Sequence, residues 1–135
     1  NNHFNFDEPA DVFEFHTKED EIIDREVKHL FGTIIHIVKT YYHSNSSSLK
    51  AWNHICIGSD FDGLIEPVET YIDSSGHNEQ MEANNYPDLK QQLEYIFEAE
   101  RSNPELEQYF GSSKSSTLIE KIFYGNGLNF LKENL

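Results

Sequence analysis

A short apolar run that ends in two carboxylates constrains the fold of this chain more than any other stretch. Residues 54–57 (His-Ile-Cys-Ile) are followed at once by residues 58–63 (Gly-Ser-Asp-Phe-Asp-Gly). The run predicts a strand over residues 52–59, with Asp60 at its carboxyl end. In α/β enzymes, side chains at the carboxyl ends of strands face the reaction chamber. Asp60 is therefore a candidate metal ligand or proton carrier.

The two faces of this predicted strand differ in character. Side chains alternate along a strand, so Ile55 and Ile57 share one face, and the other face takes His54, Cys56, Gly58 and Asp60. If helices cover the two isoleucines, the face with His54, Cys56, Gly58 and Asp60 would point into the interior of a barrel. Cys56 is then expected to be a small buried thiol, and a single cysteine excludes an internal disulfide.

Residues 18–43 predict one long helix. Apolar side chains recur there at three- and four-residue intervals, and the stripe is wide enough for a helix wedged between layers. The expected stripe contains Ile23, Val27, Leu30, Ile34, Ile37, Val38 and Tyr41. His29, His36 and His43 share the opposite face but are successively about 10 Å apart. They cannot bind one zinc ion together, so a solvated face is expected.

The rest of the chain is predicted to form an arm, a loop and closing helices. Residues 1–17 mix aromatics with acids and predict a loop or arm, and residues 64–86 form a long acidic loop. Residues 87–135 predict helices, of which the first starts at Pro87 and buries a stripe of Leu89, Leu93, Ile96 and Phe97.

Three local signals predict helix ends in the last part of the chain. Capping-box spacing from Thr117 to Glu120 indicates a helix start. Gly125 is suited to a left-handed stop, and Asn126 to capping the next helix.

Two of these segments together resemble a known enzyme family. Residues 54–63 resemble the eighth strand and following loop of the membrane dipeptidase (renal dipeptidase-like) family of the amidohydrolase superfamily. Residues 86–89 (Tyr-Pro-Asp-Leu), and then residues 119–126 (Ile-Glu-Lys-Ile-Phe-Tyr-Gly-Asn), resemble the closing helices of that family in the same order. The resemblance covers the chain from about Trp52 to its end.

The resemblance implies a zinc-dependent dipeptidase. Members are (β/α)₈ barrels that usually hold two zinc ions and hydrolyse dipeptides. Asp60 matches a residue that binds one metal and contacts the attacking water. Asp62 and Asn126 are candidates for supporting or structural roles, with a turn favoured for Asp62 and a helix cap for Asn126. The other metal ligands of the family, a His-x-Asp pair among them, have no counterpart in the sequence.

Length limits how much of such an enzyme is present. A complete (β/α)₈ barrel needs roughly 250 residues, whereas this chain has 135. We therefore expect an α/β fold class in the form of a single C-terminal portion of a TIM barrel, rich in helix and with the last barrel strand. It would be inactive without the N-terminal barrel segments, and its unpaired strand edges favour self-association.

Charge excludes some partners. The formal net charge is −14, from 24 acidic against 10 basic residues, so binding to nucleic acid is electrostatically unfavourable. No window approaches the ~20 apolar residues of a membrane span. The sequence does not distinguish a cytoplasmic from an exported protein.

Two alternatives to catalysis stay open on the residues alone. Asp60, Asp62, Gly63 and Glu69 follow part of the spacing of a calcium loop, although Gly58 stands where that loop requires an acid. The other alternative is an acidic interaction domain without catalysis.

Overall fold

Helices make up the part of the chain that the structure describes. The computed structural model describes residues 18–58 and 83–135, and no residue in these two ranges belongs to a β-strand. The elements in chain order are α1 (Lys18–Ser44), the 3₁₀ turns η2 (Lys50–Asn53) and η3 (Ala83–Asn85), α2 (Tyr86–Glu100), α3 (Glu107–Phe110), α4 (Ser115–Glu120), the π-helical turn η4 (Lys121–Gly125) and α5 (Asn126–Asn134).

The longest helix, α1, ends one residue beyond the predicted range of 18–43. Among residues 26–44, whose side chains the structure describes, the buried ones recur at three- and four-residue spacing: Val27, Phe31, Ile34, Ile35 and Val38. The side chain of Ile23, expected in the same stripe, lies outside the described part. Ile37, expected in this stripe, is 42% exposed, because at 100° per residue it lies about 100° around the helix from the centre of the stripe. His29, His36 and His43 are exposed, as the opposite face requires.

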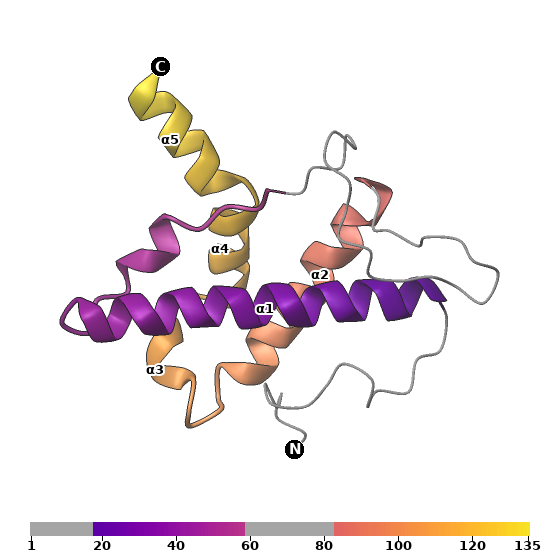
Figure 1. Cartoon of the computed structure of the whole chain (residues 1–135), viewed down its shortest axis with the longest axis horizontal. Coiled ribbons are helices and arrows are strands. Elements are labelled where there is room, and N and C mark those ends of the chain that lie inside the picture. Colours follow the sequence, from indigo (N-terminus) through magenta and orange to yellow (C-terminus); the bar gives the residue numbers. More distant parts are fainter. Residues whose placement is uncertain (1–17, 59–82) are drawn as a thin grey trace.

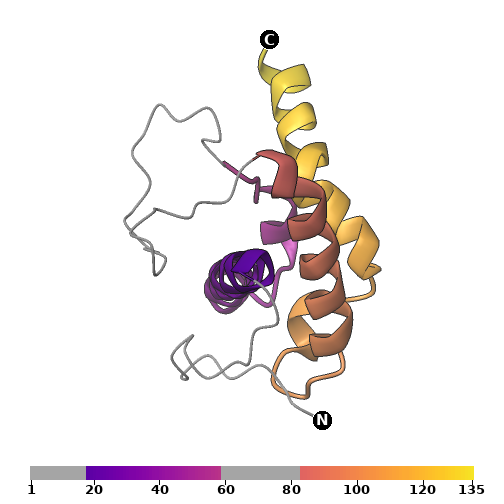
Figure 2. The same ribbon diagram turned by 90° about the vertical axis from the view of Figure 1, so that its right-hand side faces the viewer.

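The helices pack in two layers. Helix α1 crosses α2, and Figure 2 shows α1 end-on beside the layer that holds the other helices (Figures 1 and 2). Helix α1 contacts α2, α3 and η2, and α2 in turn contacts α4. Leu89, Leu93 and Phe97 of α2 are buried against this interface, as the sequence predicts, and Ile96 is half-buried.

Aromatic rings form the centre of the core. The ring centroids of Phe31, Trp52 and Phe110 lie 5.7, 5.6 and 5.6 Å from that of Phe97. These four side chains come from α1, η2, α3 and α2. One cluster therefore joins elements that are far apart in the sequence.

Helices α4 and α5 run into each other through η4, which corrects the predicted helix ends. The helix starts at Ser115 rather than Thr117, and the Ser115 Oγ donates a hydrogen bond to Glu98 Oε2 at 2.6 Å. Gly125 is right-handed, with φ −62° and ψ −45°, and does not stop the helix. Asn126 lies inside the continuous helix and is not an N-cap.

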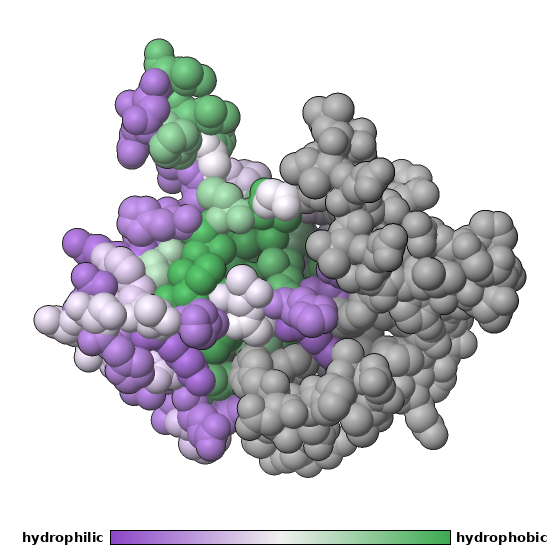
Figure 3. Space-filling model, in the orientation of Figure 1, coloured by the Kyte–Doolittle hydropathy of each residue, from purple (hydrophilic) through white to green (hydrophobic). Residues whose placement is uncertain are grey.

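Helix α5 projects beyond the rest of its layer and exposes apolar side chains (Figures 1 and 2). Figure 3 shows hydrophobic residues on α5 and again near the centre of the same face. The exposed apolar residues of α5 include Leu128, Phe130 and Leu131. No helix within the two described ranges combines the length and the apolar character needed to cross a bilayer.

The predicted strand over 52–59 is not formed among its described residues, 52–58. Residues 50–53 form η2, and residues 55–58 have no regular secondary structure. A strand is defined by its hydrogen-bonded ladder to a neighbour, and the described ranges supply no second strand. The helix-rich expectation holds for these ranges, whereas the strand does not form.

Replacing Gly111 by alanine is expected to destabilise the chain by about 1–3 kcal/mol. Gly111 has φ 62° and ψ −151°, a conformation open essentially to glycine alone. An added Cβ would also lie 2.6 Å from Leu49 Cδ1. Urea unfolding followed by the fluorescence of Trp52, the only tryptophan, measures the change.

Gly127→Ala is the matched control. Gly127 is helical and an added Cβ meets nothing within 4 Å. This variant is expected to stabilise the chain by about 0.5–1 kcal/mol. Equal effects of the two substitutions would contradict the prediction for Gly111.

Candidate functional site

The segment that leads to Asp60 shows an alternating exposure. Ile55 is buried and Ile57 half-buried against the core, while His54, Cys56 and Gly58 are exposed. This is the predicted division into two faces, although no strand ladder accompanies it. The helices cover Ile55 and Ile57, whereas His54, Cys56 and Gly58, on the face predicted to carry Asp60, are exposed.

The same segment is anchored to the closing helix by hydrogen bonds. The Asn126 side chain is 7% exposed, and its Nδ2 donates to Trp52 O at 2.9 Å and to Ile55 O at 2.8 Å. The Ile57 N–H donates to Ile122 O at 3.3 Å. Lys121 Nζ adds a bond to Asn53 Oδ1 at 2.8 Å.

Trp52 fixes the other side of this segment. Its indole Nε1–H donates to Tyr109 O at 2.8 Å, and its ring stacks on Phe110 with centroids 6.1 Å apart. Trp52 is buried, so the start of the segment is held by the core itself. The segment of residues 52–58 is therefore held in a fixed position against the helices.

The structure locates only some of the residues that the sequence singles out. Asp60 and Asp62, together with the predicted arm and most of the acidic loop, lie outside the described residues. Asn126 is described, and its amide binds two backbone carbonyls instead of capping a helix. Cys56 is exposed rather than buried, because the described helices cover only the opposite face of its segment.

The described residues do not by themselves form a metal centre. Among the side chains that the structure describes, from residue 26 to 58 and from 83 onward except residue 84, no three of His, Cys, Asp and Glu converge. His43 Nε2 is 2.9 Å from the Tyr109 hydroxyl, with which it forms a hydrogen bond. A zinc site that includes Asp60 would need its other ligands from beyond these two ranges.

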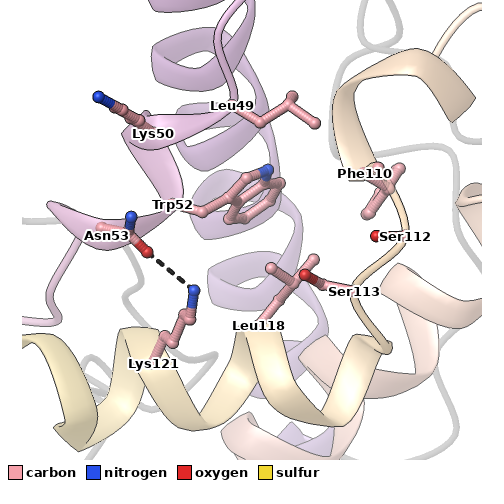
Figure 4. A pocket seen from close by; sticks show the side chains of 10 residues that line it. Leu49, Lys50, Trp52, Asn53, Phe110, Ser112, Ser113, Leu118 and Lys121 are labelled. Carbon is pink, nitrogen blue, oxygen red and sulfur yellow. Dashed lines mark hydrogen bonds between the residues drawn. The ribbon is translucent and has the colours of Figure 1, made fainter.

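A small pocket adjoins the anchored segment on the side of η2. It has a volume of about 260 Å³, with Trp52 at its centre and Phe110 and the Ser112 hydroxyl on its far side (Figure 4). Lys121 reaches towards Asn53, and Lys50 points away from the pocket (Figure 4). The lining includes these two lysines and no carboxylate, imidazole or thiol. It therefore offers none of the side chains that ordinarily bind zinc.

The Tyr86 side chain forms a contact between α2 and η4. Its ring centroid lies 5.0 Å from that of Phe123, and burial raises the pKa of its hydroxyl. The neutral hydroxyl is therefore the form favoured at this contact.

Sequence reasoning missed Trp52 and Tyr109 as anchors of the segment. Trp52 is the only tryptophan and lies two positions before the start of the apolar run at His54, which is the one signal that could have indicated its importance. Tyr109 contributes a backbone carbonyl, and no side-chain pattern identifies such a contact. No family model, no curated protein and no solved structure matches this chain.

Proposed function

We propose that this chain is part of a zinc-dependent, dipeptidase-like amidohydrolase. It would contribute residues 52–59, which would become the last barrel strand once neighbouring strands pair with them, with Asp60 as metal ligand and proton carrier, together with the helices that flank this segment. The observation that carries the proposal is the contact between the two segments that resemble this family. Asn126, at the end of the second segment, binds Ile55 O in the first, and Ile122 O accepts from the Ile57 N–H.

The alternating exposure of residues 54–58 gives further support. Helices cover Ile55 and Ile57, whereas His54, Cys56 and Gly58 are open. A barrel strand requires helices on one face and a free second face that lines the barrel interior. In a complete barrel, this open face would meet the inward-facing side chains of the other strands.

Asp60 suits the chemistry of peptide hydrolysis. Zinc, when bound, lowers the pKa of its water to about 7 and so supplies a nucleophile. An aspartate near that water can orient it, accept its proton and return a proton to the leaving amine. Its short side chain also has little rotamer freedom to lose when fixed.

Chelation tests the proposal. The full product of the gene that encodes this chain is expected to hydrolyse dipeptides, to lose more than about 90% of that activity with 1,10-phenanthroline, and to regain it with zinc. The 135-residue chain alone is expected to be inactive, because a catalytic zinc site ordinarily takes three protein ligands. Liberated amino acids are measured by chromatography.

The control for chelation is a non-chelating isomer, 1,7-phenanthroline, which should leave the activity unchanged. Hydrolysis that persists after complete removal of metal, or no hydrolysis of any dipeptide by the zinc-loaded product, would overturn the proposal.

A further inference from the structure

The pocket beside η2 joins an apolar interior to a positively charged edge. Its apolar side chains are those of Leu49, Trp52, Phe110 and Leu118, and its polar side chains are those of Lys50, Asn53, Ser112, Ser113 and Lys121. The described residues contribute no aspartate or glutamate to this lining. Acidic residues outnumber basic ones by 24 to 10 in the sequence, so the pocket favours an anion although the chain as a whole repels one.

Lys121 places a cation at the edge of the pocket. Its Nζ donates to Asn53 Oδ1 at 2.8 Å (Figure 4). An ammonium group carries three donors, and this bond uses one of them. Lys121 is also the first residue of η4, and π-helical turns, which are rare, occur frequently at functional sites. Lys50 points away from the pocket (Figure 4) and adds only a more distant charge.

Two hydroxyl groups face Lys121 across the pocket. Ser112 and Ser113 lie in the connection between α3 and α4, on the other side of the pocket from Lys121 (Figure 4). This connection is fixed by Arg101, whose Nη2 donates to Ser113 O. A serine hydroxyl can donate to a carboxylate oxygen, so both sides of the pocket offer donors to an anion.

The apolar part of the pocket is already formed in the folded chain. The indole N–H of Trp52 donates to Tyr109 O, so the ring presents apolar surface and not a donor. The Phe110 ring stacks on it with centroids 6.1 Å apart. An apolar cavity of about 150 Å³ accommodates benzene. A volume of about 260 Å³ therefore admits a tail of about six carbons with its head group.

We infer that this pocket binds a small organic carboxylate with a short apolar tail. The tail packs against Trp52 and Phe110, and the carboxylate accepts a charge-assisted hydrogen bond from Lys121 Nζ. A phosphomonoester carries about −1.5 to −2 charges at pH 7, which one lysine at the edge balances less well, so the carboxylate is the favoured head group. Binding requires neither zinc nor Asp60 and is independent of the proposed function.

The test is a titration of the 135-residue chain with hexanoate, followed by the fluorescence of Trp52, its only tryptophan. Trp52 lines the pocket, so a bound tail changes its emission directly. Hexanol and hexylamine have the same tail without the negative charge and are the ligand controls. Lys121→Met removes the cation and keeps a long side chain. Lys132→Met, on the exposed end of α5, is the matched control, because it removes the same charge outside the pocket.

A preference for the anion is the expected result. Hexanoate should bind with a Kd of about 1–10 mM, in keeping with its small size. Hexanol and hexylamine should bind at least about threefold more weakly, and Lys121→Met should weaken hexanoate binding by a similar factor of at least about threefold. Lys121→Arg, which keeps the charge, and Lys132→Met should stay within about twofold of the unmodified chain.

Three results would overturn the inference. They are an unchanged Trp52 emission across the titration, equal affinities for hexanoate and hexanol, and an unchanged affinity for hexanoate in Lys121→Met. Tighter binding of hexyl phosphate than of hexanoate would overturn the choice of head group. Should Lys121→Met not fold, Lys121→Gln, which is uncharged and polar, is compared in the same way.

Discussion

Asp60→Asn is expected to abolish dipeptide hydrolysis by the full gene product, with a loss of kcat of more than about 100-fold. Asparagine has nearly the same shape, but it cannot accept the proton of the attacking water and carries no charge for a metal. The measurement is kcat with saturating zinc, together with zinc content by mass spectrometry. Trp52, buried in the core, reports by fluorescence that the variant is folded.

Asp62→Asn distinguishes the proposed zinc-dependent dipeptidase from a calcium loop. Both aspartates would be ligands in a calcium loop, whereas the resemblance assigns a metal only to Asp60. We therefore expect Asp62→Asn to reduce kcat less than about tenfold. A fully active, zinc-loaded Asp60→Asn protein would contradict the role of Asp60 as metal ligand and proton carrier. Equal losses of calcium affinity in the Asp60 and Asp62 variants would favour the calcium loop.

The long helices could be predicted from the sequence because burial follows their periodicity. Apolar residues recur on one side of the helix within residues 18–43 and again from Leu89 to Phe97. That side faces the other layer, and α1 and α2 bury it. Such a pattern is repeated over several turns, so a single exception, such as Ile37, does not obscure it.

The expected strand shows what a local pattern cannot decide. Ile55 and Ile57 face the core while His54 and Cys56 do not, which confirms the predicted alternation. The ladder requires a second strand, and the described ranges contain none. The alternation is a property of the segment, whereas the strand depends on its neighbours.

The predicted helix caps at Gly125 and Asn126 were wrong for a related reason. Gly125 and Asn126 carry the local chemistry of a helix stop and a helix start. The structure uses the Asn126 amide for two carbonyls more than seventy positions earlier in the chain, and the helix continues through Gly125. A distant backbone acceptor is invisible in the sequence, so tertiary contacts override the local signal.

Phe97→Ala is expected to destabilise the chain more than any other substitution considered, by about 3–5 kcal/mol. Its side chain is fully buried and contacts rings from α1, η2 and α3. Removing it leaves a cavity where three elements meet, and the rigid rings around it cannot collapse to fill the space. A domain of this size is stable by only about 5–15 kcal/mol, so partial unfolding at 37 °C is expected. Urea unfolding of the chain, followed by far-UV circular dichroism, gives the free energy of unfolding.

Tyr95→Ala provides the matched control for this substitution. Tyr95 lies on the same helix but is 73% exposed, so its loss should change the free energy of unfolding by less than about 0.5 kcal/mol. Trp52 packs on Phe97, so the loss of this ring should also loosen residues 52–58. Hydrogen exchange at the Ile57 amide should therefore rise in Phe97→Ala but not in Tyr95→Ala. A loss below about 1 kcal/mol in Phe97→Ala would contradict the view that this ring joins the two layers.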